Sequence, residues 1–199
     1  MKKYILTIDQ GTTSTRAILF DHKANTIGIY QMEFTQICPK SGYVEHNADE
    51  IYQTVLECIK NVIINASIEP EEIDSIAITN QRETTVAFGF DGHPLANAIC
   101  WQSRQSQKIC DDLIARGYED MIYQKTGLHI NPYFSASKIR YLIDNNQNIK
   151  DLYDAGKALF GTMDTYILYR LTNGASFKTD ATNASRTMLY NIHTLSYDD

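Results

Sequence analysis

Three short apolar runs, separated by tight turns, occupy the first 35 residues of the chain. YILTIDQ, TRAILFDH and IGIYQMEF are rich in strand-forming residues, and only GTTS and Lys23-Ala24-Asn25 connect them. Such short connections predict an antiparallel meander of three strands. Residues 36–46, which include Pro39 and Gly42, are predicted as a loop.

Helical spacing follows this loop. Apolar residues recur every three or four positions from Ile51 to Ile63, which predicts an amphipathic helix over about residues 48–66. Asn47 followed by Glu50 is typical of a capping box at its start. Beyond this helix, DSIAIT predicts a buried strand. VAFGF and ANAICW, joined by a turn at residues 91–94, predict a second meander.

The remaining residues favour helices with some strand. Residues 103–145 are predicted to be mainly helical, interrupted by Gly117, Gly127 and Pro132, and a turn follows at Asn173-Gly174. The absence of a repeat, a low-complexity tract or a linker predicts one domain over residues 1–199. Two meanders with a crossing helix predict an α/β fold with a mixed sheet covered by helices. This layout is similar to the ribonuclease-H-like, actin-like ATPase fold.

Composition and charge narrow the classes of partner. With 43% hydrophobic and 21% charged residues and a net charge of −6, the chain is typical of a globular protein without a nucleic-acid partner. No apolar run approaches the roughly 20 residues of a membrane-spanning helix. The run after Met1-Lys2-Lys3 is too short for a signal peptide, so we expect a cytoplasmic protein. Its four cysteines lack metal-site spacing and are predicted to be packing or surface thiols.

The first hairpin, DQGTTSTR, carries candidate phosphate chemistry. A tight turn at Gly11 exposes backbone N–H groups, which can form an anion-binding concavity. Arg16 supplies positive charge to phosphate oxygens, and Asp9 offers a hard oxygen ligand for Mg²⁺. Three hydroxyl donors lie at the same edge: Thr12, Thr13 and Ser14. The alternative is a polar hairpin with a capping aspartate and a surface arginine.

The segment TNQRETT carries candidate chemistry for a neutral polyol. Arg82 donates and Glu83 accepts, and every polyol hydroxyl needs both kinds of partner. Neighbours in a regular strand face opposite sides of a sheet, so one ligand can touch both only if the backbone is bent near residues 81–84. Trp101, the single tryptophan, can cover the carbon chain of a polyol, and Tyr133 can add a hydroxyl. A surface salt bridge and a core tryptophan are the alternatives.

Several common enzyme motifs are missing from the sequence. It contains no G-x-x-x-x-G-K-[ST], G-x-G-x-x-G, H-E-x-x-H or G-x-S-x-G. The sequence therefore gives no motif evidence for a Walker-type ATPase, a Rossmann enzyme, a zincin or an α/β-hydrolase.

These motifs occur together and in order, and the chain resembles the N-terminal part of the glycerol kinases in the FGGY family of carbohydrate kinases. The resemblance extends along all 199 residues. DxGTT marks only the family, whereas QRE is more specific, because kinases of xylulose, gluconate or ribulose are expected to differ there. The matching segments are DQGTTSTR (9–16), GYVEHNADEI (42–51), ITNQRETT (78–85), NAICWQSR (97–104), GLHINPYFSASKIRYL (127–142), LFGTMDTYIL (159–168) and TDATNASRTMLYNIHTL (179–195).

The resemblance implies transfer of phosphate from MgATP to glycerol, giving ADP and sn-glycerol 3-phosphate. It implies that Asp9 serves the Mg²⁺ site and that Trp101 packs on the glycerol carbons. It implies nucleotide contacts for Thr12, Thr13, Ser14 and Arg16. It implies glycerol contacts for Arg82, Glu83 and Tyr133.

Two departures from the family pattern accompany the resemblance. Tyr141 stands where the family usually has tryptophan, which is a conservative exchange. The chain also ends at Asp199, less than halfway through a typical member. We therefore expect the general base, most of the adenine site and a second actin-like domain to lie beyond it. Neither Asp164 nor Asp180 is assigned as that base, and the chain alone is expected to have little or no turnover.

Two alternatives to glycerol phosphorylation stay open at this point. One is a related FGGY sugar kinase, and the other is a module that binds a polyol or a nucleotide without catalysis. A homo-oligomer is possible for the full-length enzyme.

Overall fold

The first apolar runs fold as the antiparallel meander that their pattern predicts. Its strands are β1 (Tyr4–Gln10), β2 (Ser14–Asp21) and β3 (Thr26–Glu33). β5 (Ile73–Asn80) pairs in parallel with the other side of β1, so the strand order is β3-β2-β1-β5. The sheet is therefore mixed, as predicted, and Asp9 lies opposite Arg16 near the hairpin tip.

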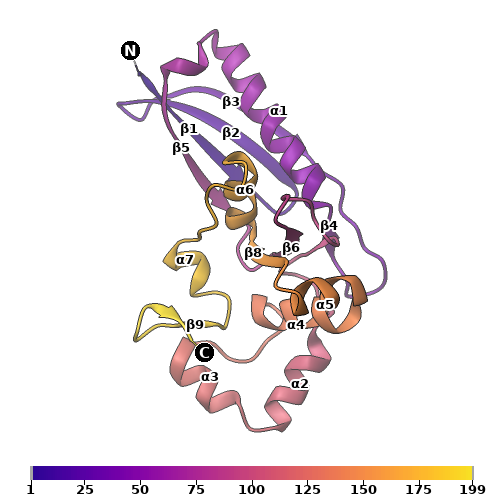
Figure 1. Cartoon of the computed structure of the whole chain (residues 1–199). Helices are drawn as coiled ribbons and strands as arrows, with labels where there is room; N and C mark the ends of the chain where they lie inside the picture. The colour runs from indigo at the N-terminus through magenta and orange to yellow at the C-terminus, as the bar shows by residue number, and fades with distance from the viewer. Residues whose placement is uncertain (1, 199) are drawn as a thin grey trace. The chain divides into compact units, whose positions relative to one another are not determined.

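The predicted amphipathic helix is present as α1 (Ala48–Ala66), which lies along one face of this sheet (Figure 1). Alternate residues of a strand point to one face, so Leu6 of β1 and Leu19 of β2 both pack toward the helix. Cys58 and Val62 complete this buried cluster from the helix side. Full burial of each large aliphatic side chain contributes about 1.5–3 kcal/mol.

The segment DSIAIT forms a strand, but the prediction that this strand is buried is wrong. Most residues of β5 are exposed, and the Ile76 side chain is 50% exposed. β5 is the edge strand of its sheet, and within residues 2–198 no other strand pairs with its outer side. Apolar composition predicts a strand without revealing whether the strand is central or at an edge.

The predicted second meander is present in part, because VAFGF and ANAICW supply neighbouring antiparallel strands, β6 and β7. β5 belongs to the first sheet, whereas VAFGF supplies a strand of a separate sheet with the order β4-β7-β6-β8. Thr85 pairs with Ile99, Phe88 forms a bridge with Pro94, and the Leu95 N–H donates to the Ala87 carbonyl oxygen, so the two segments run antiparallel on either side of the turn. The strands of this sheet are β4 (Glu45–His46), β6 (Thr85–Gly89), β7 (Ala98–Ile99) and β8 (Ala158–Thr162).

Helices dominate the later residues, as the sequence predicts. The helices are η1 (Pro70–Glu72), α2 (Gln107–Ala115), α3 (Glu119–Thr126), α4 (Ser135–Asn145), α5 (Gln147–Asp154), α6 (Met163–Leu171) and α7 (Ala181–Ala184). A short hairpin of β9 (Tyr190–Asn191) and β10 (Ser196–Tyr197) follows. Leu142 of α4 and Ile149 of α5 pack with Ala87 of β6, so these two helices form the core of this region.

The computed structural model describes residues 2–198, and its contacts divide the chain into two compact units. The first unit comprises Met1–Gln36 and Ala48–Gln81, and the second comprises Ile37–Asn47 and Arg82–Asp199. The assignment of residues 1–199 to one domain stays a prediction. Among the described residues, no helix is both long enough and apolar enough to cross a membrane.

The cysteines are packing or surface thiols, as predicted. Cys58, Cys100 and Cys110 are buried, Cys38 is exposed, and all four are free thiols. Burial raises the pKa of each of the three buried thiols above its ordinary value. These three thiols are therefore protonated at neutral pH and chemically inert.

Candidate functional site

The backbone turns sharply where the sequence places Arg82 and Glu83. Residues 81–84 belong to no strand, and Glu83 has a φ of 66°, in the left-handed region that non-glycine residues rarely adopt. Holding a residue there costs on the order of 1–3 kcal/mol, and such strain is concentrated at functional sites. The bend that a shared ligand requires is thus confirmed. Arg82 is exposed, whereas Glu83 is buried.

Neighbouring hydroxyl groups hold this turn in place. Both Ser135 Oγ and Thr85 Oγ1 donate to the Glu83 carbonyl oxygen, each at 3.2 Å. The backbone N–H of Trp101 donates to Thr84 Oγ1 at 3.2 Å. The start of α4, the start of β6 and the segment that follows β7 therefore all hold the backbone around Glu83.

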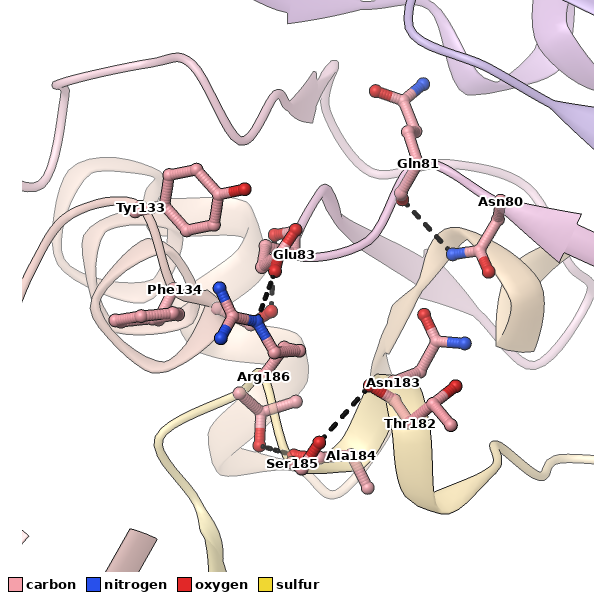
Figure 2. A network of polar contacts seen from close by, with 12 residues as sticks. Asn80, Gln81, Glu83, Tyr133, Phe134, Thr182, Asn183, Ala184, Ser185 and Arg186 are labelled. Carbon is pink, nitrogen blue, oxygen red and sulfur yellow. Dashed lines mark hydrogen bonds and ion pairs between the residues drawn. The ribbon is translucent and has the colours of Figure 1, made fainter. Parts of the chain in front are cut away.

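Arg186 is the ionic partner of Glu83. Its Nε donates to Glu83 Oε1 at 2.7 Å (Figure 2), and the Glu83 side chain is only 3% exposed. A buried carboxylate without such a partner is strongly destabilising. The guanidinium also lies 4.8 Å from the Phe134 ring centroid and 5.6 Å from that of Tyr133. These distances are within the range of cation–π attraction.

Sequence reasoning missed Arg186 as a site residue. It lies 103 positions after Glu83, and no spacing rule connects residues so far apart. The only available signal was its position in TDATNASRTMLYNIHTL, a segment that carries the family resemblance.

Trp101 and Tyr133 form an aromatic wall beside this ion pair. Their ring centroids lie 5.3 Å apart with an interplanar angle of 59°, and both residues are only half-buried. Trp101 is therefore partly exposed, and its packing on glycerol stays a prediction. A cavity of about 380 Å³ adjoins the wall, lined by Gly127, Leu128, His129, Asn131, Tyr133, Phe134 and Arg186.

The structure therefore brings three of the four predicted polyol residues together. Arg186 connects Glu83 to the Tyr133 ring, and Tyr133 contacts Trp101. Arg82 is next to Glu83 in sequence and is exposed. Donors, acceptors and flat apolar faces are the groups that a small polyol requires.

The DQGTTSTR hairpin belongs to the first compact unit. Its turn is closed by the Gly11 N–H, which donates to the Ser14 carbonyl at 2.9 Å, so this amide is used within the protein. A Cβ at position 11 would lie 3.2 Å from the same oxygen, so the turn leaves little room for a side chain there. Thr12 is half-buried and Thr13 is exposed.

Asp9, Ser14 and Arg16 are linked on one face of this hairpin. Arg16 Nη1 lies 3.8 Å from Asp9 Oδ2, and both side chains are about two-fifths exposed. Gln31 accepts from Arg16 Nε and donates to Ser14 Oγ, each at 3.0 Å. The alternative of a polar hairpin with a surface arginine accounts for these contacts equally well, so the nucleotide roles stay a prediction.

Asp9 fits one mode of magnesium binding. Mg²⁺ is commonly held by one or two carboxylates together with substrate phosphates and water. Among residues 2–198 no group of three or more His, Cys, Asp or Glu side chains forms a metal cage. Asp9 is a partly exposed carboxylate of this kind, and its role at a magnesium ion stays a prediction.

Asp180 has the features of a helix cap. Its carboxylate accepts from the N–H of Asn183 at the start of α7 and from Thr182 Oγ1. Although partial burial acts in the opposite direction, these hydrogen bonds hold the pKa of Asp180 below its ordinary value. A general base needs a pKa nearer to neutrality, so Asp180 is not assigned as one. Asp164 accepts from Thr179 and is likewise left unassigned.

The sequence of the chain places it in a known family. Residues 4–199 match the family model of the FGGY family of carbohydrate kinases, N-terminal domain, and the chain belongs to this family. It is 53% identical over 198 residues to a glycerol kinase from Enterococcus casseliflavus, covering 99% of this chain and 39% of that protein. The chain thus spans about 40% of the length of the curated relatives it matches.

Solved structures confirm the predicted ribonuclease-H-like, actin-like fold. The crystal structure of Plasmodium falciparum glycerol kinase with ADP superposes with a TM-score of 0.91 at 36% identity, covering 98% of this chain and 39% of that one. A gluconate kinase from Lactobacillus acidophilus has a TM-score of 0.87 at 28% identity, covering 100% and 38%. The fold is therefore shared by kinases of different acceptors, and residues must distinguish them.

Proposed function

We propose that the chain is the N-terminal part of an ATP-dependent glycerol kinase, which yields ADP and sn-glycerol 3-phosphate. The observation that carries this proposal is the strained turn at Glu83, which holds a buried carboxylate against Arg186 beside Trp101 and Tyr133. The 53% identity to a glycerol kinase, against 28% to a gluconate kinase, supports glycerol as the acceptor.

In this proposal each glycerol hydroxyl finds a donor and an acceptor. Glu83 accepts from a hydroxyl, while Arg82 and the Tyr133 hydroxyl donate. The half-buried Trp101 indole covers the carbon chain. A site whose buried polar groups are built for hydroxyls rejects an analogue lacking one by on the order of 10⁴-fold. Fixing the acceptor hydroxyl also supplies the proximity gain on which phosphoryl transfer depends.

The hairpin is the proposed phosphate site of the nucleotide. Arg16 gives positive charge to phosphate oxygens, and hydroxyl donors come from Thr12, Thr13 and Ser14. Asp9 would hold Mg²⁺, which when bound neutralises charge on the phosphate oxygens. No carboxylate among the described residues is assigned as general base. A cytoplasmic location and a homo-oligomeric full-length enzyme stay predictions.

A substrate panel tests this proposal. The full-length protein is given MgATP with glycerol, D-xylulose or D-gluconate, and ADP release is followed by a coupled assay. We expect kcat/KM for glycerol to exceed the values for both sugars by on the order of 10³-fold or more. A preference for xylulose or gluconate would instead identify a related sugar kinase. Absence of turnover with every acceptor would indicate a non-catalytic binding module.

A further inference from the structure

Lys138 is a fully buried lysine near the candidate acceptor site. It lies in α4 with 0% of its surface exposed, and no other lysine or arginine of residues 2–198 is buried. Removing an ammonium group from water is costly unless its hydrogen bonds are replaced. A methionine would fill a similar volume without this cost, so packing alone does not account for a lysine at this position.

The ammonium group of Lys138 binds the backbone of two aromatic residues. Its Nζ donates to the Tyr133 carbonyl oxygen and, at 3.2 Å, to the Phe134 carbonyl oxygen. These are the two residues whose rings lie against the Arg186 guanidinium. One buried donor therefore restrains the backbone that carries both rings.

The same turn of α4 reaches the other segments of the site. Ser135 Oγ donates to the Glu83 carbonyl, and Ser137 Oγ shares a buried hydrogen bond of 2.9 Å with Ser106. The titratable groups near enough to influence Lys138 are Cys100, Glu83 and Cys110. Burial is the largest influence and lowers the pKa of Lys138 to about 7. Lys138 thus lies close to the segments that carry Glu83 and Trp101.

We propose that Lys138 is a positioning residue of the acceptor site. Its hydrogen bonds to the carbonyls of Tyr133 and Phe134 fix the positions of these two rings. Trp101 packs against the Tyr133 ring and Arg186 against both rings, and Arg186 in turn fixes the position of the Glu83 carboxylate. Lys138 does not touch the acceptor itself. This inference rests on the proposed function, because the acceptor site it serves is the one assigned above.

Kinetics of the full-length protein test this role with Lys138→Met and Lys138→Gln, the latter keeping a side-chain NH₂ group that can donate hydrogen bonds. Lys150→Met, at an exposed lysine of α5, is the matched control. Loss of two hydrogen bonds should raise the KM for glycerol on the order of tenfold in Lys138→Met. The KM for ATP should change by less than about twofold, and Lys138→Gln should recover part of the loss.

Two results would overturn the proposal. One is a wild-type KM for glycerol in folded Lys138→Met. The other is a parallel rise in both KM values, which indicates general damage. If Lys138→Met does not fold, Lys138→Gln is the deciding variant. A rise in its KM for glycerol without a rise in its KM for ATP supports the role, and an unchanged KM for glycerol contradicts it.

The experiments distinguish a failure of the proposed function from a failure of the positioning role. Wild-type protein that prefers another acceptor contradicts glycerol phosphorylation, and the same KM comparison is then made with that acceptor. If the protein phosphorylates no acceptor, near-ultraviolet circular dichroism still reports on the packing of the aromatic wall. Lys138→Met must then change this spectrum relative to Lys150→Met, and identical spectra would overturn the positioning role.

Discussion

At the scale of single residues, Glu83 combines two unfavourable features. Its backbone is in the left-handed region and its carboxylate is almost fully buried. Arg186 offsets the cost of burying the carboxylate with a charge-assisted hydrogen bond. The hydroxyls of Ser135 and Thr85 hold the left-handed backbone in place through the Glu83 carbonyl oxygen. A strained, buried acceptor that its surroundings hold in place is pre-organised for a ligand hydroxyl.

The Glu83–Arg186 pair should show strong energetic coupling. Arg186→Met leaves a buried carboxylate unpaired and should destabilise the protein by about 3 kcal/mol or more. Adding Glu83→Gln removes that charge, so the double variant should lose less than the sum of the single losses, by on the order of 1–3 kcal/mol. Chemical denaturation of the four proteins measures this cycle.

The control for this cycle is Arg140→Met on the exposed side of α4, where Arg140 pairs with Asp144. An exposed pair of this kind is worth about 0–1 kcal/mol. Strictly additive losses at Glu83 and Arg186 would contradict the assignment of Arg186 as the partner that makes this carboxylate tolerable.

At the scale of elements, the β1–β2 hairpin brings the candidate phosphate residues together. Antiparallel pairing places Asp9 opposite Arg16, and Gln31 of β3 joins Arg16 to Ser14. The hairpin register therefore sets which side chains share a face. Asp9 and Arg16 already interact at 3.8 Å, so a phosphate would bind beside a preformed ion pair.

Substitutions in the hairpin should affect turnover more than glycerol binding. Asp9→Asn or Arg16→Ala in the full-length protein should lower kcat on the order of 100-fold, because each removes charge aimed at the phosphates and their metal. The KM for glycerol should stay within about twofold of the wild-type value. Initial rates at varied glycerol concentration measure both constants. Lys60→Ala, at an exposed lysine of α1, is the control, and wild-type kcat in both hairpin variants would exclude the phosphate assignment.

Local pattern predicted the elements better than their partners. Alternating and helical spacing predicted β1 to β3 and α1, because each is determined by residues close in sequence. The edge position of β5 and the separate sheet of β6 depend on pairings between distant segments, which periodicity does not encode. The bend at Glu83 was predictable as a requirement of a shared ligand. Arg186 and Lys138 were not, because their roles depend on tertiary contacts.

At the scale of the whole molecule, the candidate residues are divided between the two compact units. The hairpin with Asp9 belongs to the first unit, and the group around Glu83 belongs to the second. The chain also spans about 40% of the length of its curated relatives. The four residues that we propose to contact glycerol, Arg82, Glu83, Trp101 and Tyr133, all belong to the second unit.

Glycerol binding to the full-length protein without nucleotide tests this central claim most directly. Isothermal titration calorimetry is run on the wild type, on Arg82→Ala and on the control Arg140→Ala, with gluconate as a second ligand. We expect saturable heat from glycerol in the wild type and the control. Binding should be weakened on the order of tenfold or more in Arg82→Ala, and gluconate should give no heat. Equal glycerol affinity in Arg82→Ala and the wild type, or saturable gluconate binding, would contradict the account.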